Sequence, residues 1–199
     1  MIYIKQTRVC TKDKHPHFFG YGSLVNRDTH SFAPVHRSRI KGWRRVWHRA
    51  PVRPAAFLSV VRDENAEIEG VIAPVPNDDW VALDAREYAY DRISVTDAVT
   101  HQADAVRDIS IYAIPPHAAA PPNEDHPILL SYIDAVMQGY LREFGEAGAT
   151  RFMTTTEGWD TAVRDDRDAP IYPRAQLLSG FERSFVDDML SSIGARVRP

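Results

Sequence analysis

The sequence predicts an α+β fold in which strands come first and helices follow. Residues 17–114 contain short runs rich in aromatic and β-branched residues, the composition typical of strands. Residues 128–194 instead carry apolar side chains at helical spacing. The proline-rich residues 115–127 separate these regions and are unsuited to a helix or an inner strand. With 199 residues, 44% of them hydrophobic, the chain can bury one sizeable core, so we expect a single domain.

The composition favours a protein of the reducing cytoplasm. The net charge of −3 is too mild to predict a nucleic-acid or membrane partner. The single cysteine, Cys10, excludes an intramolecular disulfide. Residues 1–16 read as a polar leader with a short strand at 2–4, without the apolar core of a secretory signal. No apolar run is long enough to span a bilayer, so we expect a cytoplasmic location.

The stretch from Phe18 to Leu24 organises the rest of the chain. Phe18 and Phe19 have the bulk that a strand favours, and Gly20 and Gly22 permit backbone angles closed to other residues. A strand that breaks into such a loop exposes successive N–H groups, which can hold a carboxylate or an oxyanion. An ordinary tight turn is the alternative. We expect a central strand that ends in a binding loop formed by Tyr21, Gly22, Ser23 and Leu24.

The segment that follows is basic. Residues 29–62 contain no acidic residue and interleave arginines with Trp43 and Trp47. This pattern fits strands with arginines on their wet faces, or a positive rim that attracts an anionic small molecule. Binding of RNA is the alternative, but the net negative charge of the chain disfavours it. Two central strands are expected at 57–61 and 70–75, joined by a charged turn at 63–69.

The later strands and the helices follow from spacing. Strands are expected at 88–95 and 107–114, the latter with Ile109, Ile111 and Ala113 on one face. A short helix is expected at 80–87, with a cap at Asn77 or Asp78. Two longer amphipathic helices are expected, the first from 129 to Gly145 and the last from 178 to Gly194.

Glu87 stands on the apolar face of the short helix. Trp80, Leu83 and Glu87 are at i, i+3 and i+7 and therefore share one side of it. If Glu87 points inward, desolvation raises its pKa and suits it to proton transfer near neutral pH. If it lies at a frayed helix end, it points to water instead.

Neither the histidines nor the aspartates predict a metal site. His15 and His17 form a pair without further ligands at zinc spacing. Asp165, Asp166 and Asp168 lie close together but lack the spacing and the turn glycine of a calcium loop. We therefore expect no bound metal and interpret the aspartates as a solvated turn.

The order of these features resembles the γ-glutamylcyclotransferase family. In that family a Tyr-Gly-Ser-(Asn)-Leu loop closes the first strand, and one glutamate acts as general acid and base. Here the loop is Tyr21-Gly22-Ser23-Leu24, and Leu83-Asp84-Ala85-Arg86-Glu87-Tyr88 is similar to the family's Leu-Asp-x-x-Glu pattern. The bacterial members also share three later segments, which are here Ser131-Tyr132-Ile133-Asp134, Asp165-Asp166-Arg167 and Pro170-x-Tyr172-Pro173-Arg174.

The resemblance implies a fold and an activity. The fold is a small, mostly antiparallel sheet curled into a barrel, with flanking helices. The activity is the attack of a γ-glutamyl α-amine on its own side-chain amide, which yields 5-oxoproline and a free amine without a metal or organic cofactor. Glu87 is then the catalytic acid and base, and the substrate is a γ-glutamyl amino acid, a γ-glutamylamine or glutathione. The implied substrate-binding residues are Tyr21, Gly22, Ser23, Leu24 and Tyr172.

Other classes of function remain open at this point. A non-catalytic module can use the same loop to bind a small anion or a γ-glutamyl group, with Glu87 in a structural role. A nucleic-acid binder would use the basic residues 37–53 and leave the loop as a turn. Among enzymes, a γ-glutamylamine cyclotransferase or a side-chain-removing biosynthetic relative would share every residue named above. The sequence predicts neither the choice of γ-glutamyl substrate nor the oligomeric state.

Overall fold

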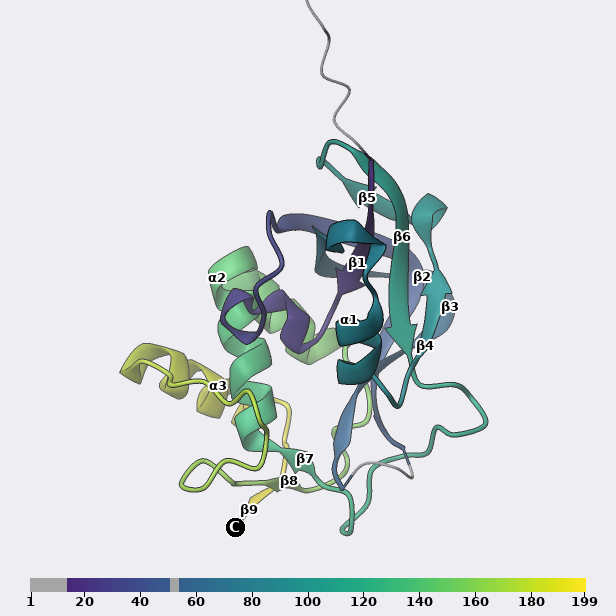
Figure 1. The fold of residues 1–199 in the computed structure, drawn as a ribbon. Helices are drawn as coiled ribbons and strands as arrows, with labels where there is room; N and C mark the ends of the chain where they lie inside the picture. Colours follow the sequence, from purple (N-terminus) through teal and green to yellow (C-terminus); the bar gives the residue numbers. More distant parts are fainter. Residues whose placement is uncertain (1–13, 51–53) are drawn as a thin grey trace, which may run out of the picture.

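The computed structural model describes residues 14–50 and 54–199, and within this part nine strands form one curled sheet (Figure 1). The expected strand at 2–4 and most of the polar leader lie outside these residues, although β1 already begins at His15. The strands are β1 (His15–Gly20), β2 (His36–Arg49), β3 (Ala56–Pro74), β4 (Asp91–Ser94), β5 (Val99–His101), β6 (Val106–Ala113), β7 (Ile128–Leu129), β8 (Val163–Arg164) and β9 (Val197–Arg198).

The sheet is mixed and does not close into a barrel. The β1 strand pairs antiparallel with β3 and parallel with β6, so it is central, as the sequence predicts. Phe18 and Phe19 on β1 are buried. Among the described strands, β4 pairs only with β6, and β5 only with β2. The sheet therefore curls but keeps open edges, which confirms the α+β fold with a curled sheet and flanking helices.

The expected hairpin at 63–69 is absent, because β3 is one continuous strand of 19 residues. The β2 strand pairs with both halves of β3, with Ile40 opposite Ile68 and Trp43 opposite Arg62. Between these pairs Gly42, with φ of +79°, stands against residues 63–66. The extra residues form a bulge rather than a turn. Cross-strand pairing on both sides of the bulge outweighs the local charge pattern.

The two halves of β3 differ in their neighbours. The half near residues 71–74 lies between β1 and β2 and is central, as expected. The half at 57–61 pairs only with β2 among the described strands, so the prediction of a central strand there is wrong. This half forms one border of the open part of the sheet.

The strand expected at 88–95 is shorter than predicted, because residues 88–90 form a turn. The N–H of Tyr90 donates to the carbonyl of Glu87 at 2.8 Å, which reverses the chain before β4. The prediction for β6 is confirmed, since Ile109, Ile111 and Ala113 are all buried.

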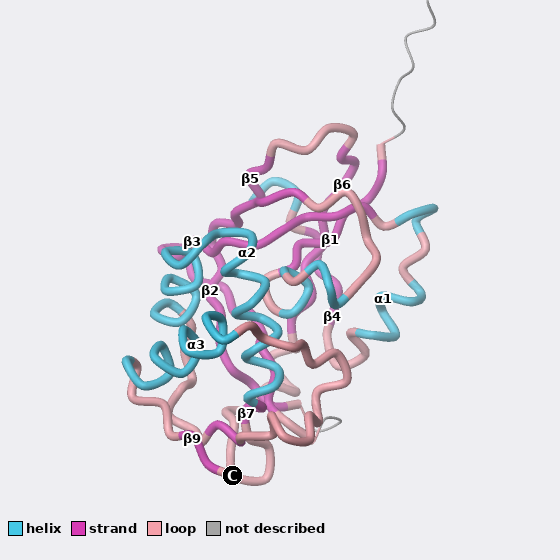
Figure 2. Tube along the Cα trace, turned by 90° about the vertical axis from the view of Figure 1, so that its left-hand side faces the viewer, coloured by secondary structure: helices cyan, strands magenta, loops and turns pink. Residues whose placement is uncertain are grey.

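In the described part of the chain three α-helices flank the sheet: α1 (Val81–Arg86), α2 (Leu130–Thr155) and α3 (Gly180–Ser192). In Figures 1 and 2, α2 and α3 lie together on one side, while α1 lies apart from them. The first long helix does not end at Gly145 as expected; Gly145, with φ of +67°, kinks α2, which continues to Thr155. None of the helices in the described residues is long and apolar enough to span a membrane.

The short helix α1 begins differently from the prediction. Its N-cap residue is Trp80, and neither Asn77 nor Asp78 caps it, because both have positive φ in a preceding 3-10 turn (Pro76–Asp78). The Asp79 carboxylate instead accepts a hydrogen bond from the N–H of Val81 at 3.1 Å.

Two charged residues that the sequence placed in water are buried. Arg45 on β2 is 2% exposed, and Asp166 is 6% exposed. Asp166 accepts hydrogen bonds from the backbone N–H of Ser131 (2.8 Å), from the Ser131 hydroxyl and from the N–H of Ile171 (2.8 Å). The interpretation as a solvated turn is therefore wrong for Asp166, which binds the first turn of α2, while Asp165 and Asp168 are exposed as expected.

Candidate active site

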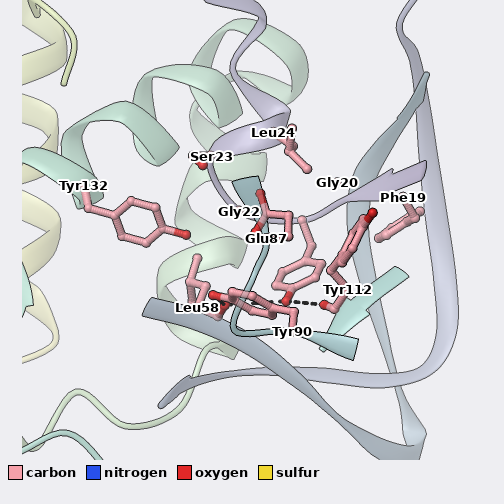
Figure 3. Close-up of a pocket in the computed structure, with 11 residues that line it drawn as sticks. Phe19, Gly20, Gly22, Ser23, Leu24, Leu58, Glu87, Tyr90, Tyr112 and Tyr132 are labelled. Atoms are coloured by element: carbon pink, nitrogen blue, oxygen red, sulfur yellow. Dashed lines mark hydrogen bonds between the residues drawn. The ribbon is translucent and has the colours of Figure 1, made fainter. Parts of the chain in front are cut away.

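A cavity opens where β1 ends, between the loop after β1, the end of α1 and the open part of the sheet (Figure 3). Its empty volume, which includes space open to solvent, is about 330 Å³. The binding loop and Glu87, both selected from the sequence, lie on its wall. The complete lining is Phe19, Gly20, Tyr21, Gly22, Ser23, Leu24, Leu58, Glu87, Tyr90, Tyr112 and Tyr132.

The loop turns its carbonyl groups toward the protein and away from the cavity. A 3-10 turn at Ser23–Val25 closes the loop, and its hydrogen bonds use none of the N–H groups of Gly22, Ser23 and Leu24. The carbonyls of the preceding residues, Tyr21, Gly22 and Ser23, each accept a hydrogen bond from another group of the protein. The donors are the Tyr140 hydroxyl to Tyr21 (2.9 Å), the Val25 N–H to Gly22 (2.9 Å), and the Asn26 N–H (3.1 Å) and Thr29 hydroxyl (2.8 Å) to Ser23.

The geometry of the peptide bond then sets the direction of the N–H groups. In a trans peptide the N–H points opposite to the carbonyl of the preceding residue. The N–H groups of Gly22, Ser23 and Leu24 therefore point away from the partners of those carbonyls, and all three residues line the cavity. Successive N–H groups in this arrangement form a site for a carboxylate or an oxyanion.

Glu87 is the C-cap residue of α1 and keeps only 16% of its side chain exposed. The Arg86 Nε lies 3.0 Å from Glu87 Oε1. Arg86 is itself fixed to the loop, because it donates to the Thr29 carbonyl (2.9 Å) and the Ser23 hydroxyl (3.2 Å). The guanidinium stabilises the charged carboxylate and couples its position to that of the binding loop.

Tyr132 on α2 adds a hydroxyl to the cavity. Its ring packs edge-on against Trp47 (5.7 Å between centroids), Phe57 (5.1 Å) and Tyr172 (4.9 Å), and the residue is 5% exposed. A Cβ built on Gly22 would lie 2.8 Å from the Tyr132 hydroxyl, so this hydroxyl faces the loop. Within the described residues it has no hydrogen-bond partner, and Figure 3 shows it pointing into the cavity. It is available to a ligand.

Two more tyrosines connect the open edges of the sheet. The Tyr21 hydroxyl donates to the Tyr112 carbonyl on β6 at 2.7 Å, and the Tyr90 hydroxyl donates to the Leu58 carbonyl on β3 at 2.9 Å. These bonds hold the floor of the cavity together where no strand pairing does.

Tyr21 and Tyr132 in the cavity remain protonated. Burial raises the pKa of Tyr21 well above 10, and the nearby Tyr132 and Glu87 add to the rise. Burial likewise raises the pKa of Tyr132, with contributions from Tyr90, Tyr172 and Glu87. Both side chains are therefore hydrogen-bond donors near neutral pH, close to a carboxylate.

A sequence model named "Gamma-glutamyl cyclotransferase, AIG2-like" matches residues 18–132, more than half of the chain. The chain belongs to this family. The match includes every residue that lines the cavity, from Phe19 to Tyr132. No curated protein sequence gives a significant match to the chain.

Several solved structures share the fold at low sequence identity. One named "Gamma-glutamyl cyclotransferase" superposes with a TM-score of 0.51 at 13% identity, over 88% of this chain and 99% of its own. The uncharacterised human protein loc79017 gives 0.54 at 15% identity, over 86% and 97%. YkqA from Bacillus subtilis gives 0.53 at 17% identity, over 75% and 58%. These similarities support the cyclotransferase fold.

Tyr172, the fifth residue expected to bind substrate, does not line the cavity. It is 6% exposed and packs against Tyr132 and Phe57. The structure thus places it behind the Tyr132 ring, and its contact with substrate stays a prediction. No group of three or more potential metal ligands occurs in residues 14–50 and 54–199.

Sequence reasoning missed several residues of the cavity. Tyr132 stood in a segment similar to the cyclotransferase family, but no role was assigned to it. Tyr90 was assigned to a strand, and Arg86 was quoted without a role. Leu58 and Tyr112 read as ordinary strand residues, because which strands form an open edge cannot be read from periodicity.

Proposed function

We propose that this protein is a cyclotransferase that releases 5-oxoproline and a free amine from a γ-glutamyl compound. The observation that carries the proposal is the meeting of two groups in one cavity. These are the carboxylate of Glu87 and the N–H groups of the family loop, Gly22, Ser23 and Leu24. An anion site beside a base is what a substrate with adjacent α-carboxylate and α-ammonium groups requires.

Substrate binding follows from these charges. The loop N–H groups hold the α-carboxylate of the γ-glutamyl group, which places its α-ammonium near Glu87. The Arg86 guanidinium lies 3.0 Å from the Glu87 carboxylate and holds it where it can accept a proton from the ammonium. The cavity then holds the γ-glutamyl chain in a folded-back conformer, in which the amine reaches the side-chain carbonyl.

The reaction then proceeds in two steps. The free α-amine attacks the γ-carbonyl carbon, forming the carbon–nitrogen bond of the five-membered ring and placing negative charge on the carbonyl oxygen. The Tyr132 hydroxyl, which lacks a partner in the described chain, donates a hydrogen bond to that oxygen. The original amide bond then breaks as the carboxyl group of Glu87 gives its proton to the leaving nitrogen. The ring nitrogen gives up its second proton to the Glu87 carboxylate, which releases it to water or to the free amine.

The test is Glu87→Gln, which keeps the size of the side chain but cannot accept the ammonium proton. Release of 5-oxoproline from γ-glutamyl amino acids, γ-glutamylamines and glutathione is measured for both proteins. We expect the variant to lose at least ~10²-fold in turnover, the usual scale for removing a general acid–base group. It should retain substrate binding in calorimetry and a normal unfolding temperature.

Glu146→Gln, at an exposed position on α2, is the matched control and should behave as the wild type. A stable Glu87→Gln with wild-type turnover would remove Glu87 from the mechanism. Binding of γ-glutamyl compounds without release by the wild type would instead identify a non-catalytic module.

A further inference from the structure

A buried arginine lies behind the binding loop and lacks an acidic partner. Arg45 is 2% exposed, and none of the ion pairs in the described part of the chain includes it. Its guanidinium lies over the rings of Tyr140 (5.4 Å) and Phe152 (5.0 Å). It also donates to the hydroxyls of Thr155 (3.1 Å) and Thr156 (3.2 Å). Burying a charge without a counter-charge is costly, so its position calls for an explanation.

The remaining hydrogen bonds of Arg45 lead to the loop. Its Nη1 donates to the Tyr140 hydroxyl at 3.0 Å and to the Glu69 carbonyl at 3.1 Å. The Tyr140 oxygen lies 2.9 Å from the Tyr21 carbonyl and 2.8 Å from the Glu69 carbonyl. A guanidinium only donates, so Tyr140 accepts from Arg45 and must donate its own proton onward. The Glu69 carbonyl already accepts from Arg45, whereas the Tyr21 carbonyl has no other donor in the described residues, so we assign the Tyr140 proton to the Tyr21 carbonyl.

The direction of this series of hydrogen bonds fixes the orientation of the Tyr21–Gly22 peptide in the loop. A phenol that accepts from a cation becomes a stronger donor. Burial raises the pKa of Tyr140 to about 12, although the charge of Arg45 opposes this, so the proton stays on the phenol. The Tyr21 carbonyl is thus held toward the core, and the Gly22 N–H of the same planar peptide is held in the opposite direction, at the cavity.

We propose that Arg45 and Tyr140 are positioning residues that orient the Gly22 N–H toward the α-carboxylate of the substrate. The inference rests on the proposed function for the identity of that carboxylate. Neither residue lines the cavity, and both act through the Tyr21–Gly22 peptide. Arg45 also places a positive charge behind the loop, which favours an anion at the loop.

Tyr140→Phe tests this role, because it removes only the hydroxyl. We expect KM for the γ-glutamyl substrate to rise roughly five- to tenfold, the scale of one lost hydrogen bond, with kcat changed less than about twofold. Thr156→Val is the matched control. It also removes a buried hydroxyl partner of Arg45, but one that does not contact the loop, so KM should stay at the wild-type value while stability falls.

A second pair of variants tests the charge. Arg45→Met should raise KM at least as much as Tyr140→Phe, and Arg45→Lys should recover part of the loss because it keeps a positive charge. Arg44→Met, on the same strand but at a surface ion pair with Asp63, should leave KM unchanged. If Arg45→Met does not fold, Tyr140→Phe still decides the inference.

The resonance of the Gly22 amide in a nitrogen-15 NMR spectrum of the free protein gives a readout that needs no activity. It should shift in Tyr140→Phe and stay in place in Thr156→Val. Equal KM changes in both variants, a change in kcat alone, or an unchanged KM and Gly22 resonance in Tyr140→Phe would each overturn the inference. A wild type that releases no 5-oxoproline contradicts the proposed function instead, and the Gly22 resonance then decides the positioning.

Discussion

Tyr132 combines a core ring with a hydroxyl that faces the cavity. Three aromatic neighbours fix the ring, and the hydroxyl lies opposite Gly22. A residue of this kind is hard to recognise in a sequence, because helical spacing indicates burial and says nothing about one polar atom at the tip. Glu87 was easier to find, since its motif follows the glycine loop in the order that the family shares.

Tyr132→Phe should separate the two roles of this side chain. The ring remains and the hydroxyl has no partner in the described residues, so the free energy of unfolding should change by less than about 0.5 kcal/mol. The release of 5-oxoproline should slow at least ~10-fold, because an oxyanion donor is lost. Tyr88→Phe, at a tyrosine that is 57% exposed and outside the cavity, is the control. A wild-type rate in Tyr132→Phe would show that the Tyr132 hydroxyl does not stabilise the oxyanion.

Among the elements, the first turn of α2 depends on a residue far along the chain. Asp166 accepts both the N–H and the hydroxyl of Ser131 next to Tyr132 in sequence. The start of α2 has no side-chain cap of its own, so Asp166 supplies the acceptor from outside the helix.

Asp166→Ala should therefore destabilise the protein by at least ~2 kcal/mol, because it leaves buried donors without a partner. The measurement is urea-induced unfolding. Asp168→Ala removes an exposed carboxylate from the same cluster and should change stability by less than about 0.5 kcal/mol. Similar values for both variants would contradict the distinction between the buried and the exposed aspartate.

The loop between β1 and β2 carries a pH-dependent anchor. The N–H of Phe32 donates to His30 Nδ1 at 3.2 Å, so the ring proton lies on Nε2, which donates to the Leu24 carbonyl at 3.0 Å. Burial lowers the pKa of His30 below its ordinary value of 6.5; the bond to Leu24 opposes this, and the charges of Arg86 and Arg27 reinforce it. The folded protein thus prefers neutral His30.

Because the unfolded chain takes up this proton first, the stabilisation is present above about pH 6.5 and is lost as the pH falls toward the lower folded pKa. We expect the free energy of unfolding to decrease between pH 7 and pH 5. His30→Phe should reduce this slope without abolishing it, because burial also lowers the pKa of His17. His117→Gln, at an exposed histidine, should keep the full slope. An unaltered slope in His30→Phe would rule out His30 as its source.

The local pattern of apolar and charged residues predicted β1 and β6 but failed for the middle of β3. The alternation in β6 and the aromatic end of β1 were sufficient, because both strands are buried with consistent faces. The charged middle of β3 suggested a turn, but pairing with β2 on both sides of a bulge keeps it extended. Tertiary pairing of this kind is not encoded within a short window.

Across the whole molecule, the basic segment is balanced by carboxylates from other elements. Arg37 and Arg39 pair with Glu143 (3.6 Å) and Glu69 (3.3 Å), and Arg44 pairs with Asp63 (3.1 Å). Together these pairs lower the positive potential on the exposed side of β2.

We therefore expect no tight binding of RNA or DNA. Titration at physiological salt should give no affinity in the micromolar range, and weak binding at low salt should not show the steep salt dependence of many phosphate contacts. A triple variant, Glu143→Gln with Glu69→Gln and Asp63→Asn, should bind more than the wild type at low salt. Micromolar binding by the wild type would restore the nucleic-acid interpretation.

The cavity is assembled from segments that span more than half of the chain, from Phe19 to Tyr132. During synthesis the glycine loop leaves the ribosome early, while the hydroxyl opposite it and the ring packing behind it arrive only with α2. Contacts between such distant positions form late in folding, since closing a long loop costs entropy. A chain still being synthesised therefore has the loop without the wall opposite it, and we expect nascent chains to be unable to enclose a ligand until α2 has been translated.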